Sequence, residues 1–166
     1  KLDKSIGIMK AYSTCVGEGP FTAEYFGEKA EKLRQAGGEY GAATGRPRRV
    51  GPFDVVASRY GIRCQGADEI ALTKLDILSG HDELEICAAY ELDGKRITEF
   101  PFPDALDHCK PVFEKVKGWN CDISACRKYE ELPKEARDYV ELLEKLCECK
   151  IAYISVGAER DAIIRR

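Results

Sequence analysis

Long apolar runs are absent from this chain of 166 residues. The longest unbroken run covers residues 86–90, whereas a transmembrane helix needs about 20 apolar residues. Residues 1–10 also lack the apolar stretch and the small-residue cleavage site of a secretory signal peptide. We therefore expect a cytoplasmic protein that has no membrane partner.

Metal-binding spacings are also missing, although the chain has eight cysteines. No two of them form Cys-x-x-Cys, and neither the Cys147-x-Cys149 pair nor the Cys121-x4-Cys126 pair fits a zinc finger or ribbon. We therefore predict no metal site and reduced thiols, several of them packed in the core. A cysteine-based metal or redox protein stays open as an alternative, which bound zinc or missing titratable thiols would favour.

An excess of basic charge is lacking as well, because the net charge is −3. This balance argues against nucleic acid as a partner. Hydrophobic residues make up 44% and charged residues 33% of the chain, as in a globular protein. The length predicts about one domain, so we expect residues 1–166 to form a single unit.

Strand and helix patterns alternate along the chain. A helix is predicted after an N-cap at Thr22, and the Asp93-Gly94 turn predicts a β-hairpin. Predicted strands lie at 5–15, 69–75, 84–91, 96–100, 111–116, 151–155 and 162–164, and predicted helices at 23–35, 53–60 and 133–147. This order predicts an α/β fold with a largely parallel sheet, flanking helices and an inserted β-hairpin.

The first candidate site follows the predicted strand 69–75, at Thr73-Lys74-Leu75-Asp76. Ligands of open α/β sheets bind beyond the carboxyl ends of the strands. A carboxylate at Asp76 could accept hydrogen bonds from guanine N1–H and the 2-amino group, which adenine does not offer in that arrangement. The stem of Lys74 could lie along the base while its ammonium stays solvated. The alternative is that Asp76 only caps a turn.

A second segment, Ser155-Val156-Gly157, ends another predicted buried strand. Gly157 permits close approach of a ligand, and backbone N–H groups there could donate to guanine O6. Alone it is a common strand-to-loop turn. Together, the two segments resemble the guanine-binding loops of GTP-binding proteins.

The third candidate is the loop at residues 41–49, GAATGRPRR. Its glycines permit a tight turn whose N–H groups could converge on an anion. Arg46, Arg48 and Arg49 are bidentate donors suited to carboxylate or phosphate. The alternative is a solvated basic loop, and a nucleic-acid patch is disfavoured because no aromatic residues are interleaved.

Taken together, these segments resemble the adenylosuccinate synthetase family, the ligases that join IMP and L-aspartate. Six blocks in the family's order carry the resemblance: residues 10–14, 16–21, 41–49, 72–76, 112–119 and 155–157. In that family GTP phosphorylates the 6-oxygen of IMP, and the aspartate amino group then displaces phosphate. Mg²⁺ offsets charge on the phosphates. The resemblance thus implies GTP, IMP and L-aspartate as substrates.

The resemblance also implies a role for each matching position. GTP binding falls to Arg48, Lys74, Leu75, Asp76, Ser155, Val156 and Gly157. Aspartate binding falls to Ala42, Ala43, Thr44, Gly45, Arg46, Pro47 and Arg48, and IMP binding to Val16 and Arg46. The chain departs from the family at Ala43, where threonine is usual, and at Pro52, where tryptophan is usual.

The family's phosphate loop, catalytic Asp and catalytic His have no match here. We therefore expect no catalytic residue in this chain and read His81 and His108 as surface or structural residues. The chain is interpreted as the carboxy-terminal portion of a P-loop-NTPase-like synthetase fold, inactive alone and homodimeric when complete. The Mg²⁺ ligands would lie outside it. The alternative function is a stand-alone guanine-nucleotide binding module.

Overall fold

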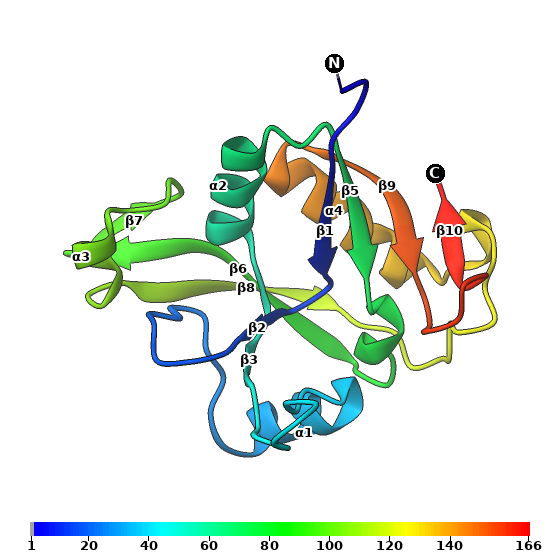
Figure 1. Ribbon diagram of the computed structural model, residues 1–166, viewed down its shortest axis with the longest axis horizontal. Helices are drawn as coiled ribbons and strands as arrows, with labels where there is room; N and C mark the ends of the chain where they lie inside the picture. Colours follow the sequence, from blue (N-terminus) through cyan, green and yellow to red (C-terminus); the bar gives the residue numbers. More distant parts are fainter. Residues whose placement is uncertain (1) are drawn as a thin grey trace.

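Two four-stranded β-sheets, a small two-stranded sheet and the helices around them form the chain, whose residues 2–166 are described by the computed structural model. The first sheet has the order β1 (Ile6–Lys10), β5 (Glu69–Thr73), β9 (Lys150–Ser155) and β10 (Ile163–Arg165). Strands β1, β5 and β9 run parallel, and β10 is antiparallel to β9. These four strands stand side by side in the right half of Figure 1.

The second sheet is built around the long strand β6 (Glu83–Leu92). Strand β4 (Phe53–Asp54) pairs with it in parallel, and β7 (Lys95–Ile97) and β8 (Lys110–Lys117) pair with it antiparallel. Asp93 and Gly94 both have positive φ, 52° and 73°, as a two-residue hairpin turn requires. The predicted β-hairpin is therefore confirmed.

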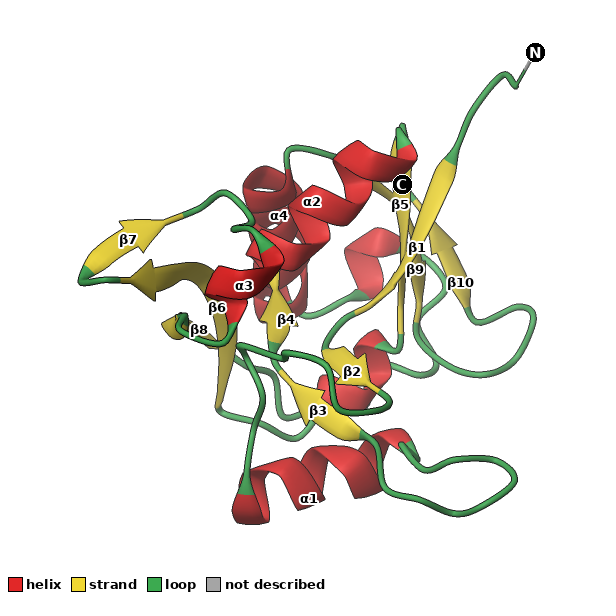
Figure 2. Cartoon of the chain, turned by 60° about the vertical axis from the view of Figure 1, so that its left-hand side comes forward, coloured by secondary structure: helices red, strands yellow, loops and turns green. Residues whose placement is uncertain are grey.

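Helices pack between and below the sheets. Helix α4 (Lys134–Cys147) buries Ala136, Tyr139, Val140 and Leu143 on one face and lies beside α2 (Val55–Gln65), as Figure 2 shows. Helix α1 (Gly27–Gly37) packs on β3 (Arg49–Gly51), the partner of β2 (Ser13–Cys15). Short turns of helix are α3 (Pro103–Leu106), η1 (Leu75–Leu78) and η2 (Tyr129–Glu131).

The α/β class predicted from the sequence is confirmed, with parallel pairing in the first sheet. One cluster of buried residues joins both sheets, since it includes Ile70 and Ile154 of the first and Ile86 of the second. Among the described residues, no helix is both long and apolar enough to cross a membrane.

The helix predicted at 23–35 begins later than expected. Thr22 is not its N-cap, because α1 starts at Gly27 after Phe26, which makes no side-chain cap. The preceding backbone is used elsewhere: the Glu24 N–H donates to Phe21 O at 3.1 Å and the Tyr25 N–H to Val50 O at 2.8 Å. Pairing with β3 therefore delays the helix.

The helix predicted at 53–60 is longer and starts slightly later. Residues 53 and 54 form β4, and the Asp54 side chain caps α2 by accepting from the Ala57 N–H at 3.1 Å. Gly61 does not end the helix. Gly66, with φ 58°, does so instead, because a left-handed residue is needed to close the last turn.

Candidate functional site

The two predicted strand-end segments lie next to each other. Strands β5 and β9 are parallel neighbours in which Leu72 is aligned with Ile154. Residues 73–76 and 155–157 therefore leave the sheet at the same edge, where β1 also ends at Lys10. The sheet thus brings together the carboxyl ends of the strands, which is the place where the sequence interpretation expects a ligand.

Asp76 has an unused acceptor at this edge. Within residues 2–166, its Oδ1 is buried and has no hydrogen-bond partner. Burial raises the pKa of the Asp76 carboxyl above its usual range, and hydrogen bonds from nearby backbone N–H groups and the charge of Lys74 oppose this rise only partly. Capping a turn does not explain an acceptor left free in the interior.

Lys74 is held in a different way from the one expected. Its backbone adopts the left-handed region, with φ 60° and ψ 34°, which costs a non-glycine residue on the order of 1 kcal/mol. Its ammonium is not simply solvated: it donates to Gly37 O at 2.6 Å and to Glu39 Oε1 at 2.9 Å. The lysine is therefore fixed by protein groups on both backbone and side chain.

The loop at residues 155–157 is more occupied than predicted. The Val156 N–H donates to Ala162 O at 3.0 Å, so this conformation does not offer it to a base oxygen. The Ser155 hydroxyl donates to Gly157 O at 2.9 Å. A Cβ on Gly157 would lie 3.2 Å from Ala162 Cβ, so close packing within the chain already favours glycine there.

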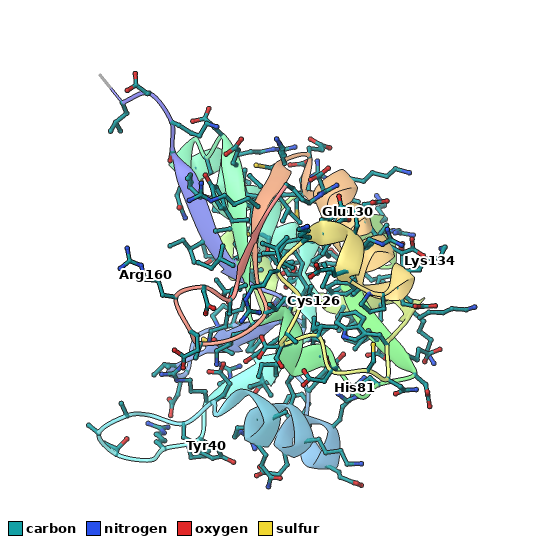
Figure 3. All side chains as sticks on the ribbon, turned by 90° about the vertical axis from the view of Figure 1, so that its right-hand side faces the viewer. Tyr40, His81, Cys126, Glu130, Lys134 and Arg160 are labelled. Atoms are coloured by element: carbon teal, nitrogen blue, oxygen red, sulfur yellow. The ribbon has the colours of Figure 1, made fainter. Side chains whose placement is uncertain are left out.

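The arginine loop does not form the predicted anion nest. The Gly41 N–H donates to Arg46 O and the Gly45 N–H to Gly41 O, both at 2.8 Å, and the Arg46 N–H faces Thr44 Oγ1 at 3.3 Å. These N–H groups close the loop on itself instead of converging on an anion. Residues 42–47 are exposed, and Figure 3 shows Tyr40 at the foot of the loop, which extends away from the body of the chain.

The three arginines of this segment have different surroundings. Arg46 is exposed. Arg49 donates to Glu24 Oε2 at 2.6 and 2.9 Å and to the carbonyls of Gly17 and Gly19, so its role is structural. Arg48 donates through Nη1 to Glu39 Oε2 at 2.9 Å. In the described part of the chain its Nε is buried without a partner, so it is a free donor.

Glu39 is the site residue that sequence reasoning missed. Its side chain is 0% exposed and accepts from Lys10, Tyr12, Arg48 and Lys74. Burial alone would raise the pKa of Glu39, but the hydrogen bonds from Tyr12, Lys10 and Lys74 outweigh it and lower the pKa to about 2. No local pattern singles out Glu39, because its partners lie up to 35 positions away.

Comparison with known proteins identifies the family. The sequence model of adenylosuccinate synthetase matches residues 1–164. The chain belongs to the adenylosuccinate synthetase family. It is 53% identical over 160 residues to the adenylosuccinate synthetase of Pelobacter propionicus, which covers 96% of this chain and 37% of that relative. It is 51% identical over 164 residues to the adenylosuccinate synthetase of Synechococcus sp., and this match covers 98% of this chain and 37% of that relative.

A solved structure gives the same answer for the fold. The structure of fully ligated adenylosuccinate synthetase from Plasmodium falciparum matches with a TM-score of 0.93 at 37% identity, covering 99% of this chain and 40% of that chain. The chain therefore spans about 37% of the length of the curated relatives named above. The resemblance predicted from six sequence blocks is confirmed.

The departures from the adenylosuccinate synthetase pattern lie in different surroundings. Ala43 is exposed on the loop, whereas Pro52 is buried and lines a cavity of about 550 Å³ between α1 and β6. Val16 is 77% exposed, His81 is half-buried in the wall of the same cavity and His108 is exposed. The predicted contacts of Ala43 and Val16 with substrates stay predictions, and so does the interpretation of His81 and His108 as surface or structural residues.

Among residues 2–166, no group of three or more His, Cys, Asp or Glu side chains is placed to hold a metal ion. The eight cysteines are free thiols, of which Cys87, Cys147 and Cys149 are buried.

Proposed function

We propose that this chain forms part of an adenylosuccinate synthetase, which uses GTP to join IMP and L-aspartate into adenylosuccinate during AMP synthesis. The observation that carries the proposal is an unsatisfied buried acceptor, Asp76 Oδ1, at the edge where β5 and β9 end. It is the only carboxylate oxygen among four buried side-chain atoms that lack a partner in the described chain, the others being the Nε atoms of Arg48, Arg59 and Arg137. Buried polar atoms without partners are rare and need a reason.

The guanine base would be read at the edge where β5 and β9 end. The Asp76 carboxylate accepts from N1–H and the 2-amino group, while the stem of Lys74 lies along the base. Leu75, Ser155, Val156 and Gly157 form the surroundings, and Gly157 has no hydrogen bond of its N–H to another described residue. An adenine base would leave the carboxylate unpaired, which costs about 1–3 kcal/mol.

The exposed loop would capture aspartate. Arg46 supplies a bidentate guanidinium for the aspartate carboxylate and reaches towards IMP, whose ribose contacts the backbone of Val16. Ala42, Ala43, Thr44, Gly45 and Pro47 form the rest of the loop, and Arg48 directs its free Nε towards the GTP phosphates. The isolated backbone bridge between Tyr40 and Pro47 closes the base of the loop.

Other parts of the reaction would come from the remainder of the enzyme. The catalytic Asp and His, the phosphate loop and the magnesium ligands are assigned to an amino-terminal half, and this chain to a single carboxy-terminal unit that is inactive alone. A homodimer and a cytoplasmic location belong to the same proposal. The eight free thiols support a reducing compartment.

The test is a steady-state assay of the complete enzyme that contains this sequence. Adenylosuccinate should form only when GTP, IMP and L-aspartate are all present, and ATP should not replace GTP. Equal rates with ATP would refute the guanine assignment. Tight GDP binding by the purified 166-residue chain, with no ligase activity in the complete protein, would instead favour a guanine-nucleotide binding module.

A further inference from the structure

One buried carboxylate gathers cations from three separate segments. Glu39 Oε1 accepts from Lys10 Nζ and Lys74 Nζ, both at 2.9 Å, and from the Tyr12 hydroxyl at 2.6 Å. Glu39 Oε2 accepts from Arg48 Nη1 at 2.9 Å and from Lys10 Nζ at 3.0 Å. The lysine proposed for the base and the arginine proposed for the phosphates are therefore joined through a single side chain.

The charges in this cluster do not cancel. Lys10, Lys74 and Arg48 bring three positive charges, and Glu39 is the only carboxylate within ion-pair distance of them in the described chain. The Glu39 side chain is 0% exposed, so water does not screen it. Part of this positive charge is offset by the Asp76 carboxyl, which Lys74 also influences, and the remaining excess suits an anionic ligand. Glu39 prevents mutual repulsion from driving the cations apart.

The backbone of Glu39 also anchors the arginine loop. Its carbonyl accepts the Arg48 N–H at 2.9 Å, and its own N–H donates to Arg34 O at 2.9 Å. Lys74 Nζ reaches the same turn through Gly37 O at 2.6 Å. A change in the position of Lys74 is therefore transmitted to the residue from which loop 41–46 extends.

We propose that Glu39 is a positioning residue that couples guanine-nucleotide binding to aspartate capture, by holding Lys74 and Arg48 on one carboxylate at the foot of loop 41–46. This rests on the function proposed above. The base packs on the stem of Lys74, Lys74 holds Glu39, and Glu39 holds Arg48 and the loop. Binding of GTP then lowers the KM for aspartate, a coupling between two sites that share one network.

The first test uses the complete enzyme with Lys74→Met, a half-exposed position where folding should survive. Lys74 contacts the base in the proposed function and does not contact aspartate. We expect the KM for aspartate, as well as that for GTP, to rise about tenfold, the effect of losing about 1.4 kcal/mol. An unchanged KM for aspartate in Lys74→Met would overturn the proposal.

The second test replaces Glu39 itself, with a matched control nearby. Glu39→Gln should raise both KM values at least as much and abolish the dependence of the aspartate KM on GTP concentration. Glu31→Gln is the control, because Glu31 binds Arg34, Gln35 and Tyr40 beside the same loop but none of the three cations. It should change neither KM by more than about twofold.

If Glu39→Gln fails to fold, a second variant, Glu39→Asp, tests the same coupling. Glu39→Asp keeps the charge but withdraws the carboxylate by one methylene, so it should fold and still lose the coupling. Wild-type enzyme whose aspartate KM is independent of GTP concentration would refute the coupling without any variant. A wild-type enzyme that needs no GTP would instead refute the proposed function.

Discussion

Replacing Asp76 by Asn in the complete enzyme should shift its preference from GTP towards XTP. In the proposed function the carboxylate accepts two hydrogen bonds from guanine, at N1–H and at the 2-amino group. Xanthine keeps N1–H but carries an oxygen at position 2, so it needs one acceptor and one donor. An asparagine amide offers both in nearly the same volume.

The structure sets the size of the effect. Asp76 Oδ1 is buried without a partner, so a mismatched base leaves a polar pair unsatisfied away from water, at about 1–3 kcal/mol. This cost weakens the binding of GTP by the Asp76→Asn variant and the binding of XTP by the wild-type enzyme. The ratio of the two kcat/KM values should therefore move by two such steps, about 30-fold to 2 × 10⁴-fold. Since burial raises the pKa of Asp76, a neutral amide there should not impair folding.

The assay is initial-rate synthesis of adenylosuccinate with GTP and with XTP, for both proteins at saturating IMP and aspartate. Thermal unfolding of the two proteins controls for misfolding. A ratio of kcat/KM values that stays constant, in a folded variant, would show that Asp76 only caps a turn and that the base is read elsewhere.

Three further perturbations test other parts of the structure. Arg46→Leu in the complete enzyme should lower kcat/KM for aspartate by an amount equivalent to about 1.5–3 kcal/mol, since it removes the charge-assisted bidentate contact proposed with the aspartate carboxylate; an unchanged value would make Arg46 an ordinary surface residue. Because hydrogen bonds lower the pKa of Glu39 to about 2 from 4.5, its ionised form stabilises the fold above pH 4.5, and this contribution disappears as the pH falls towards 2. Urea unfolding at pH 6 and pH 3 should show a larger loss for wild type than for Glu39→Gln, and equal losses would contradict the cluster. Pro52→Trp should fill part of the cavity of about 550 Å³ and raise the free energy of unfolding by about 1–2 kcal/mol in urea titration, whereas a lower value would mean overpacking.

The sequence predicted the features of the site that depend on local pattern. Residues 73–76 and 155–157 each follow a short buried run, and parallel pairing brings the carboxyl ends of β5 and β9 to one edge. The apolar spacing of 133–147 predicted α4, which begins after Pro133 at Lys134. In each case a few neighbouring residues contain the whole signal.

Contacts between distant residues could not be predicted in this way. Glu39 meets Lys10 across 29 positions and Lys74 across 35, and nothing near it in the sequence indicates either partner. The late start of α1 has the same origin, because the Tyr25 N–H is taken by Val50 O of β3. The hydrogen bonds inside loop 41–46 also depend on its closed conformation, which the glycines permit but do not specify.

The fold explains why a charged side chain is retained in the interior at Glu39. Lys10 is the last residue of β1 and Lys74 follows the last residue of β5 at the same edge, and Arg48 approaches them from the loop. Burying one carboxylate is costly, and the cost is offset only where several cations bind it in good geometry. The cations in turn stay close together only because the carboxylate separates their charges. An apolar residue at position 39 would therefore destabilise the chain unless the cations were replaced as well, and replacing them would remove the groups proposed to bind GTP.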